Sequence, residues 1–378
     1  LGRTTRRGPV GAFDGVGFPL GTAGGWFFFF VVTAATAYYT NALGWVLYYA
    51  VGQVMQGVGL PWSAGILPPE TGFDGRSFAL QLLCTGLVIL ACAIVLLRGL
   101  RAGIEAASRF LMPLLFGCLL VLIVRSVTLP GSWQGVEWFI LKFDPAALTP
   151  SVAVAAVGQA IFSLSLGGSF MVVYGSYLRE GEDLRANAVW TAIGDVGAGL
   201  LAGLAILPAV FAFGLEPASG PGLIFFTLPE VFAQIPVGWL FGILFFGGLL
   251  GAAYLSDVAA FEVLVAGLVD NTRLSRAQAV WTLAAVVFVF AIPPMINMKI
   301  FVPWDLFFGS GMQTLGALLA TLAAGWSISR ARLVEELGGS GRQQDLLIFW
   351  LRFVVPGVIL GLGLWWLLSD VLKIVGSV

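Results

Sequence analysis

The sequence is poor in charged residues and contains no histidine. Asp, Glu, Lys and Arg together make up 10% of its 378 residues, whereas a soluble domain of this length carries about a quarter. This scarcity of charge excludes an ordinary soluble domain, and the formal net charge of −1 gives no indication of nucleic-acid binding. The absence of histidine argues against zinc ligation and imidazole proton relays.

Cysteine is also scarce, and its positions argue against a redox role. The three cysteines, Cys84, Cys92 and Cys118, all lie in apolar segments. We therefore expect buried thiols and no disulfide. The sequence also shows no nucleophile–base pair, metal-ligand cluster or phosphate loop, so we do not expect an enzyme.

What the sequence has in abundance is long apolar segments. Hydrophobic residues make up 59% of the chain, and its mean hydropathy is +0.96. Because a helix needs about 20 apolar residues to cross a bilayer, we predict an all-α polytopic membrane protein with about nine transmembrane helices. The predicted spans are residues 24–53, 78–98, 109–128, 152–178, 189–213, 237–268, 278–298, 304–327 and 348–369.

The distribution of arginine and lysine orients these spans. If residue 1 lies in the cytoplasm and the spans alternate, most cationic residues fall on the inner side, as the positive-inside rule requires. This predicts a multi-pass protein of the cell's inner (plasma) membrane, with its C-terminal end outside the cytoplasm. Residues 214–236 are too apolar for a solvated loop. We interpret them as a hairpin packed back into the protein as a lid, or as an interfacial helix.

Residues 161–177, IFSLSLGGSFMVVYGSY, form an apolar segment with an unusual interior. Gly167 and Gly168 lie in its middle, although each glycine costs a helix about 1 kcal/mol relative to alanine. Unpaired backbone at membrane depth is tolerated where it lines a cavity or is buried in protein, and transporters use such breaks to bind substrate and ions. The alternative is that the glycines only allow close helix packing. Composition alone does not separate these two interpretations.

Ionisable residues within the spans indicate function, because an idle charge at membrane depth is costly. Asp195 and Asp257 are the strongest candidates of this kind. Glu262 has the alternative of a structural pairing with a neighbouring helix. Asp270 and Asp305 lie at span ends, where a charge at the headgroups explains them as well as a gate does.

The chain resembles the neurotransmitter:sodium symporter family, particularly its bacterial amino-acid transporters. GQAIFSLSLGGSFMVVYGSY is similar to the family's sixth helix, whose pattern is GQ-x-FFSLSLG-x-G…Y-x-SY. IEAASRFLMPLLF, AGLAILPAVFAFG and GLIFFTLPEVFAQIP resemble the entry to the fifth helix, the seventh helix and the fourth extracellular loop. The resemblance implies helices three to eleven of an inverted-repeat fold, unwound at 167–169.

The resemblance also implies a division of the chain and roles for single residues. Residues 1–378 would form one transmembrane domain that lacks helix one and most of helix two. It would comprise the remainder of the first repeat (24–128), the second repeat (152–327) and an additional helix (348–369). The implied substrate-binding residues are Ala35, Tyr39, Phe162, Ser165, Gly167, Gly168, Ser169 and Ala260. The implied sodium-binding residues are Ser163, Asp195, Ala252 and Ser256, and the implied gate residues are Gln159, Asp305, Tyr177 and Asp270.

Departures from the family pattern sharpen the expected substrate. Ala35, Gly168 and Ala260 stand where bulkier residues are usual, and discrimination follows pocket volume. We therefore expect a bulky or aromatic amino acid such as tryptophan.

Two further departures concern the ions. Asp195 lies four residues before Gly199, the position that decides chloride dependence in the family, and on the same helical face. This predicts chloride-independent transport. Leu255 replaces an oxygen ligand of the second sodium site, which leaves the sodium stoichiometry open.

The function predicted from the sequence is sodium-coupled symport of amino acids by alternating access. The expected partners are sodium ions, an amino-acid substrate and the lipid bilayer, without nucleic acid, and a homodimer is left open. The family's first helix supplies much of both sites, so an inactive paralogue and a membrane scaffold or regulatory partner are alternatives. A sodium symporter of another small organic solute is a second alternative.

Overall fold

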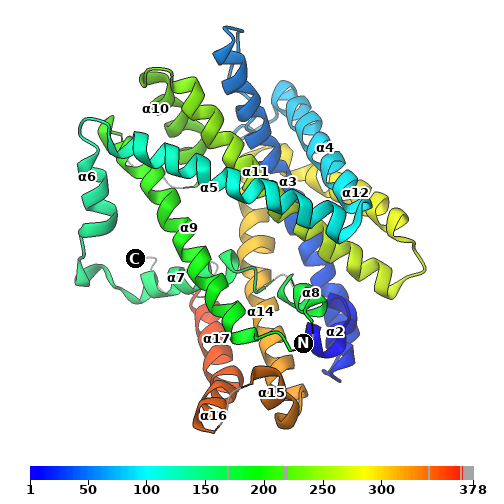
Figure 1. Cartoon of the computed structure of the whole chain (residues 1–378). Helices are drawn as coiled ribbons and strands as arrows, with labels where there is room; N and C mark the ends of the chain where they lie inside the picture. The colour runs from blue at the N-terminus through cyan, green and yellow to red at the C-terminus, as the bar shows by residue number, and fades with distance from the viewer. Residues whose placement is uncertain (168–169, 180, 216–219, 339–340, 367, 369–378) are drawn as a thin grey trace.

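The computed structural model describes residues 1–167, 170–179, 181–215, 220–338, 341–366 and 368. All regular structure in this part of the chain is helical, and the helices form a bundle with several steeply inclined members (Figure 1). Eight stretches are long and apolar enough to cross a membrane. They are Gly21–Gly57, Gly75–Leu97, Gly103–Val127, Leu184–Ala212, Gly238–Asn271, Arg276–Met295, Met298–Ser327 and Arg342–Trp365. Each overlaps one predicted span, and the broken pair described below corresponds to the ninth.

Two long helices cross at the centre of the bundle and carry most of the core. They are α3 (Gly21–Gly57) and α11 (Gly238–Asn271), which pack on each other and on α4 (Gly75–Leu97) and α12 (Arg276–Ala291). Small residues such as Ala34 and Ala37 of α3 are fully buried, which allows the helices to approach closely. The three cysteines are buried and free, as the sequence predicts.

The other spans surround this centre. Helices α5 (Ala106–Val127) and α9 (Leu184–Ala212) pack on each other, and α5 also packs on α11. The stretch 298–327 consists of α13 (Met298–Trp304), a π-helical segment (Asp305–Gly311), α14 (Met312–Leu322) and a second π-helical segment (Ala323–Ser327). After α15 (Arg330–Leu337), the last span combines α16 (Arg342–Phe349), a π-helical segment (Trp350–Val354) and α17 (Val355–Trp366).

The ninth predicted span is divided into α7 (Pro150–Ser163) and α8 (Phe170–Tyr177). The start of α7 follows from local chemistry, because the Thr149 side chain accepts from the Val152 amide and Pro150 occupies the first helical position. The two halves emerge at different places in the bundle, with α8 beside the N-terminal helices (Figure 1). The predicted break is therefore present.

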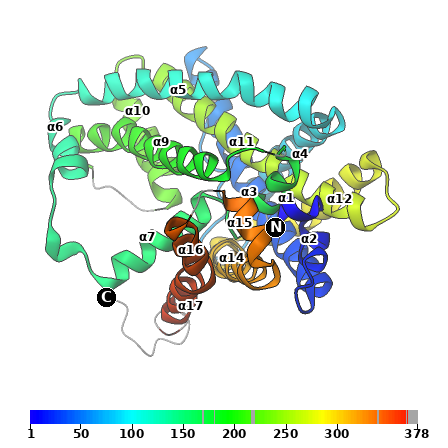
Figure 2. The ribbon, with the colours of Figure 1, turned by 60° about the horizontal axis from the view of Figure 1, so that its bottom comes forward.

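The segments predicted to face the cytoplasm meet at one end of the molecule. The short helices α1 (Gly2–Thr5) and α2 (Pro9–Gly15) lie near α15, as Figure 2 shows. The Arg3 Nε donates to Glu336 Oε2 of α15 at 2.5 Å. At the other end, the Met298 amide donates to the Pro69 carbonyl at 2.9 Å, which joins two segments predicted to lie outside. This grouping agrees with the predicted alternation of the spans.

The apolar hairpin after α9 packs back into the protein. Its described part comprises a π-helical segment (Leu223–Thr227) and α10 (Leu228–Gln234). The Phe225 ring lies 5.1 Å from the Tyr49 ring and 5.8 Å from the Trp45 ring, measured between centroids. The described part of this segment therefore packs on the core, as the hairpin prediction requires. Its role as a lid stays a prediction.

Remaining short helical segments connect these elements. They are the π-helical segments Leu100–Glu105 and Glu137–Leu141, the 3-10 segments Pro145–Ala147 and Pro293–Met295, and α6 (Trp133–Val136).

Candidate functional site

A cavity of about 150 Å³ lies where α3, α11 and α14 meet the break between α7 and α8. It combines apolar surface with hydroxyl and amide groups. Its lining residues are Ala35, Thr36, Tyr38, Tyr39, Phe162, Ser163, Ser165, Phe170, Ser256, Ala260 and Gln313. Of these, Ala35, Tyr39, Phe162, Ser163, Ser165, Ser256 and Ala260 were predicted as substrate or sodium residues, so the fold brings together residues that lie far apart in the sequence.

The break begins earlier than the sequence predicts. Helix α7 ends at Ser163, and Ser165 adopts a left-handed backbone with φ of 53°. This conformation is costly for a residue with a side chain and persists where the surroundings impose it. Of the predicted unwound residues, Gly168 and Ser169 lie outside the described part of the chain.

Gly167 is held against α14 by contacts between backbones. A Cβ atom at Gly167 would lie 2.0 Å from the Gln313 carbonyl oxygen, and one at Gly316 would lie 1.9 Å from the Gly167 carbonyl oxygen. Neither position has room for a side chain unless the backbone moves. Gly167 therefore lies in the break and also allows close packing, but it does not line the cavity, and its role in substrate binding stays a prediction.

The predicted sodium residues fall into two places. The Ser163 hydroxyl donates to the Asp195 carboxylate, which joins the end of α7 to the middle of α9. Hydroxyl and carboxylate oxygens are the ligands that hard cations prefer. On α11, the Ser256 hydroxyl donates to the Ala252 carbonyl at 3.4 Å. Ser163 and Asp195 thus form one pair of oxygen-bearing side chains at the cavity, and Ser256 of α11 adds another hydroxyl to its lining.

Asp257, the other strong candidate from the sequence, does not line this cavity. Its side chain is fully buried and accepts from the Thr40 hydroxyl at 2.9 and 3.1 Å. The Cys92 thiol lies 3.6 Å from its second oxygen. Asp257 therefore links α11 to α3 and α4.

The predicted outer gate residue Asp305 lies against α3. The Tyr38 hydroxyl and the Asp305 carboxylate both lie beside Gly309. A Cβ atom at Gly309 would lie 2.2 Å from the Tyr38 hydroxyl and 2.8 Å from Asp305 Oδ1, so this glycine leaves space for the pair. Gln159, also predicted near the outer gate, is exposed on α7 and does not line the cavity.

The predicted cytoplasmic gate residues have separate partners. The Tyr177 hydroxyl donates to Glu262 Oε1 at 3.0 Å, and the Asp270 carboxylate accepts from the Gly8 amide at 2.7 Å. Arg276 donates to both oxygens of Glu262, at 3.1 and 2.6 Å. The structure thus places Glu262 at the centre of this cluster, and it confirms the pairing of Glu262 with a neighbouring helix.

The sequence analysis missed four lining residues. Thr36 and Tyr38 follow Ala35 on α3, and Phe170 opens α8. The fourth, Gln313, is a polar residue inside an apolar span, and the rule that singled out the buried acids could have found it. Gln313 was omitted because the sequence analysis considered only ionisable residues within the spans and not neutral polar ones.

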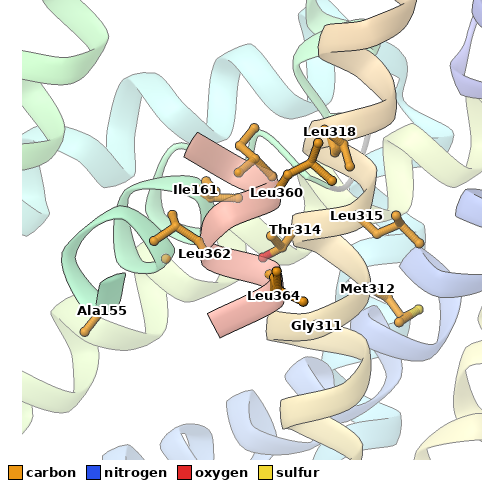
Figure 3. A pocket seen from close by; sticks show the side chains of 13 residues that line it. Ala155, Ile161, Gly311, Met312, Thr314, Leu315, Leu318, Leu360, Leu362 and Leu364 are labelled. Carbon is orange, nitrogen blue, oxygen red and sulfur yellow. The ribbon is translucent and has the colours of Figure 1, made fainter. Parts of the chain in front are cut away.

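A larger groove of about 530 Å³ lies on the other side of α7, between α7, α14 and α17. Figure 3 shows Ile161 of α7, Leu315 and Leu318 of α14, and Leu360 and Leu362 of α17 around it. Its lining is almost entirely apolar, so it offers no partner for a charged amino acid. Despite its size, this groove carries fewer polar groups than the smaller cavity, so it matches the predicted amino-acid site less well.

A membrane helix broken beside a cavity of oxygen-bearing side chains defines a secondary transporter. The comparisons with known proteins agree. A model of the sodium:neurotransmitter symporter family matches residues 77–364. The chain belongs to this family.

Relatives support the same assignment. The chain is 33% identical over 350 residues to an uncharacterized sodium-dependent transporter, YhdH, from Bacillus subtilis, covering 88% of this chain and 76% of that protein. It is 32% identical over 341 residues to an uncharacterized sodium-dependent transporter from Haemophilus influenzae, covering 86% and 74%. The solved structure of MhsT in complex with L-phenylalanine matches with a TM-score of 0.81 and 31% identity, covering 96% of this chain and 85% of that one.

Proposed function

We propose that this member of the family is a sodium-coupled symporter of bulky or aromatic amino acids. The observation that carries the proposal is the cavity at the helix break. Small side chains (Ala35 and Ala260) leave space on its apolar side, while Phe162 and Phe170 offer aromatic surface. The polar side supplies hydroxyls for a charged ligand. The similar structure of MhsT holds L-phenylalanine, which supports the aromatic class.

Sodium is the coupling ion in this proposal. Relatives are described as sodium-dependent transporters. The Ser163–Asp195 cluster would supply hard oxygen ligands and a negative charge beside the substrate. Because Asp195 already carries this charge, transport needs no chloride.

The membrane arrangement is part of the same proposal. Residue 1 lies on the cytoplasmic side of the inner (plasma) membrane, and the last span leads outward. Residues 24–128 would form the remainder of the first inverted repeat and residues 152–327 the second, and movement of one against the other would expose the cavity to either side in turn.

A transport assay tests these points together. Protein expressed from its complete reading frame is reconstituted in proteoliposomes, and tryptophan uptake is measured with sodium or potassium outside. We expect saturable uptake that requires sodium and is equal in chloride and gluconate. A binding series that peaks at glycine or alanine would contradict the substrate class. Uptake that collapses in gluconate would contradict the role of Asp195, and the absence of sodium-dependent binding would favour a scaffold.

A further inference from the structure

Thr36 of α3 is a polar residue that adjoins the apolar part of the cavity. It follows Ala35, one of the two small residues that leave space for a bulky side chain, and it lines the cavity itself. It is only 3% exposed. Neither the sequence pattern nor the proposed function assigns it a role.

The packing of α3 on α11 places Thr36 level with Ala260, the second small residue. The two helices run antiparallel and meet at several levels, which are marked by the pairs Gln53 and Gly242, Thr40 and Asp257, and Phe29 and Gly267. Each step along α3 is matched by an equal step back along α11, so Thr36, one turn before Thr40, lies level with Ala260. Thr36 therefore flanks the space that Ala35 and Ala260 leave, where the proposed function places the side chain of the substrate.

The Thr36 hydroxyl has already used its one hydrogen. It donates to the Val32 carbonyl at 2.8 Å, within the same helix. A hydroxyl oxygen also has two lone pairs, and no residue in the described part of the chain donates to this one. Towards a ligand, Thr36 is thus an acceptor, and a ligand group that meets it has to be a donor.

The indole N–H of tryptophan is the donor that suits this place. An indole ring carries one N–H donor and no acceptor, whereas the phenylalanine ring carries neither. A buried indole N–H usually finds a hydrogen-bond partner. In a space bounded by alanine side chains, the Thr36 hydroxyl supplies that partner without disturbing its own bond to Val32.

We propose that Thr36 is a specificity-determining residue whose hydroxyl accepts a hydrogen bond from the indole N–H of tryptophan. This inference rests on the proposed function and deepens it, because it selects one side chain within the aromatic class. The selection is modest, since phenylalanine leaves no group of Thr36 unpaired. A neutral hydrogen bond of this kind changes affinity by about threefold to tenfold.

A ligand pair isolates this hydrogen bond. In 3-benzothienylalanine, sulfur replaces the indole N–H of tryptophan, so the shape is kept and the donor is lost. Sodium-dependent binding of both ligands, and of tyrosine, is measured by competition with radiolabelled tryptophan on purified protein expressed from its complete reading frame. The quantity compared between variants is the ratio of the affinities for tryptophan and 3-benzothienylalanine.

Two substitutions at the site and one control give the contrast. Thr36→Val removes the acceptor at nearly constant shape and should lower the affinity ratio by about threefold to tenfold, whereas Thr36→Ser should keep the ratio. Thr33→Val is the matched control. Thr33 lies on the same helix, is also 3% exposed and donates to the Phe29 carbonyl at 2.8 Å, but it does not line the cavity. Its substitution should leave the ratio as in the wild type, and thermal unfolding checks that each variant is folded.

Four results would overturn the inference. An unchanged ratio in folded Thr36→Val would show that another group receives the indole N–H. Equal weakening of both ligands would reduce Thr36 to packing. An equal change in Thr33→Val would assign the effect to α3 as a whole. A loss for tyrosine in place of tryptophan would show that the donor is a phenol. In each case the proposed function stands, whereas wild-type protein without sodium-dependent binding of any amino acid would overturn both.

Discussion

The two halves of the broken span are held by different kinds of interaction. The first half, α7, packs through apolar side chains such as Ile161 on α14 and α17, and its polar attachment is the bond between Ser163 and Asp195. The second half, α8, is tied to α11 and α12 by the Tyr177–Glu262–Arg276 cluster. Apolar packing is not directional, whereas a hydrogen-bonded ion pair fixes one geometry. We therefore expect α7 to move at lower cost than α8.

The contact between the break and α14 is shared by both halves, so its loss should have the largest effect. Gly316→Val would place side-chain atoms against the Gly167 carbonyl, where a Cβ already lies at 1.9 Å. We expect loss of detectable sodium-dependent binding, together with a destabilisation above about 4 kcal/mol. Binding and thermal unfolding measure the two effects. Gly361→Ala in α17, where no atom lies within 4 Å, is the control and should be neutral. Sodium-dependent binding by Gly316→Val at the wild-type level would contradict the close contact between Gly316 and the Gly167 carbonyl.

Breaking the ion pair behind α8 should have the next largest effect. Glu262 is 3% exposed and Arg276 is 36% exposed, so Glu262→Gln leaves a partly screened guanidinium without its counter-charge. We expect a destabilisation of about 2 kcal/mol, measured by unfolding in denaturant. The double variant Glu262→Gln, Arg276→Met should be less destabilised than the sum of the single variants. Strict additivity would show that the pair does not anchor α8.

Changing Asp195, the polar partner of α7, should lower the affinity for sodium more than it lowers the free energy of unfolding. Asp195→Asn keeps an oxygen for Ser163 but removes the charge, so we expect the sodium affinity to fall about tenfold. Binding of tryptophan, titrated with sodium in chloride and in gluconate, measures the change. The wild type should be indifferent to chloride, whereas the variant should bind better in chloride. An unchanged sodium titration would remove Asp195 from the sodium site.

Removing an exposed ion pair should have the smallest effect on stability, and it provides a reference for the buried pair of Glu262 and Arg276. Arg330 and Asp345 form an ion pair between α15 and α16, but their side chains are 65% and 61% exposed. Asp345→Asn should change stability by no more than about 0.5 kcal/mol, because water and salt screen such pairs. If Asp345→Asn lowers the free energy of unfolding as much as Glu262→Gln does, then burial of the Glu262–Arg276 pair does not explain how α8 is held.

Local patterns predicted the helices and the break well, because they depend on neighbouring residues. Apolar length located every span, and glycine within an apolar run located the interruption. The start of the break was missed by a few residues because Ser165 carries the left-handed backbone, which serine seldom adopts without support from its surroundings. The sequence could not show that α14 supplies this support.

The site was predicted less completely, because it depends on contacts between segments that lie far apart in the sequence. Resemblance identified seven of the cavity residues, and the structure pairs Ser163 with Asp195. The partner of Tyr177 was not predictable, because Glu262 and Asp270 lie on the same helix and the packing of α8 on α11 selects Glu262. Gln313 was not predicted, because its position at the cavity depends on a helix break that lies in another part of the chain.

The contact between Gly167 and Gly316 also bears on how the protein is made. Segments enter the membrane in order of synthesis, so the broken span is inserted before α14 exists. Until Gly316 arrives, the break lacks the surface that holds its backbone, and the cavity lacks its α14 wall. The cavity therefore forms only after α14 has been synthesised, and a chain that stops before α14 should present no assembled path for ions across the membrane.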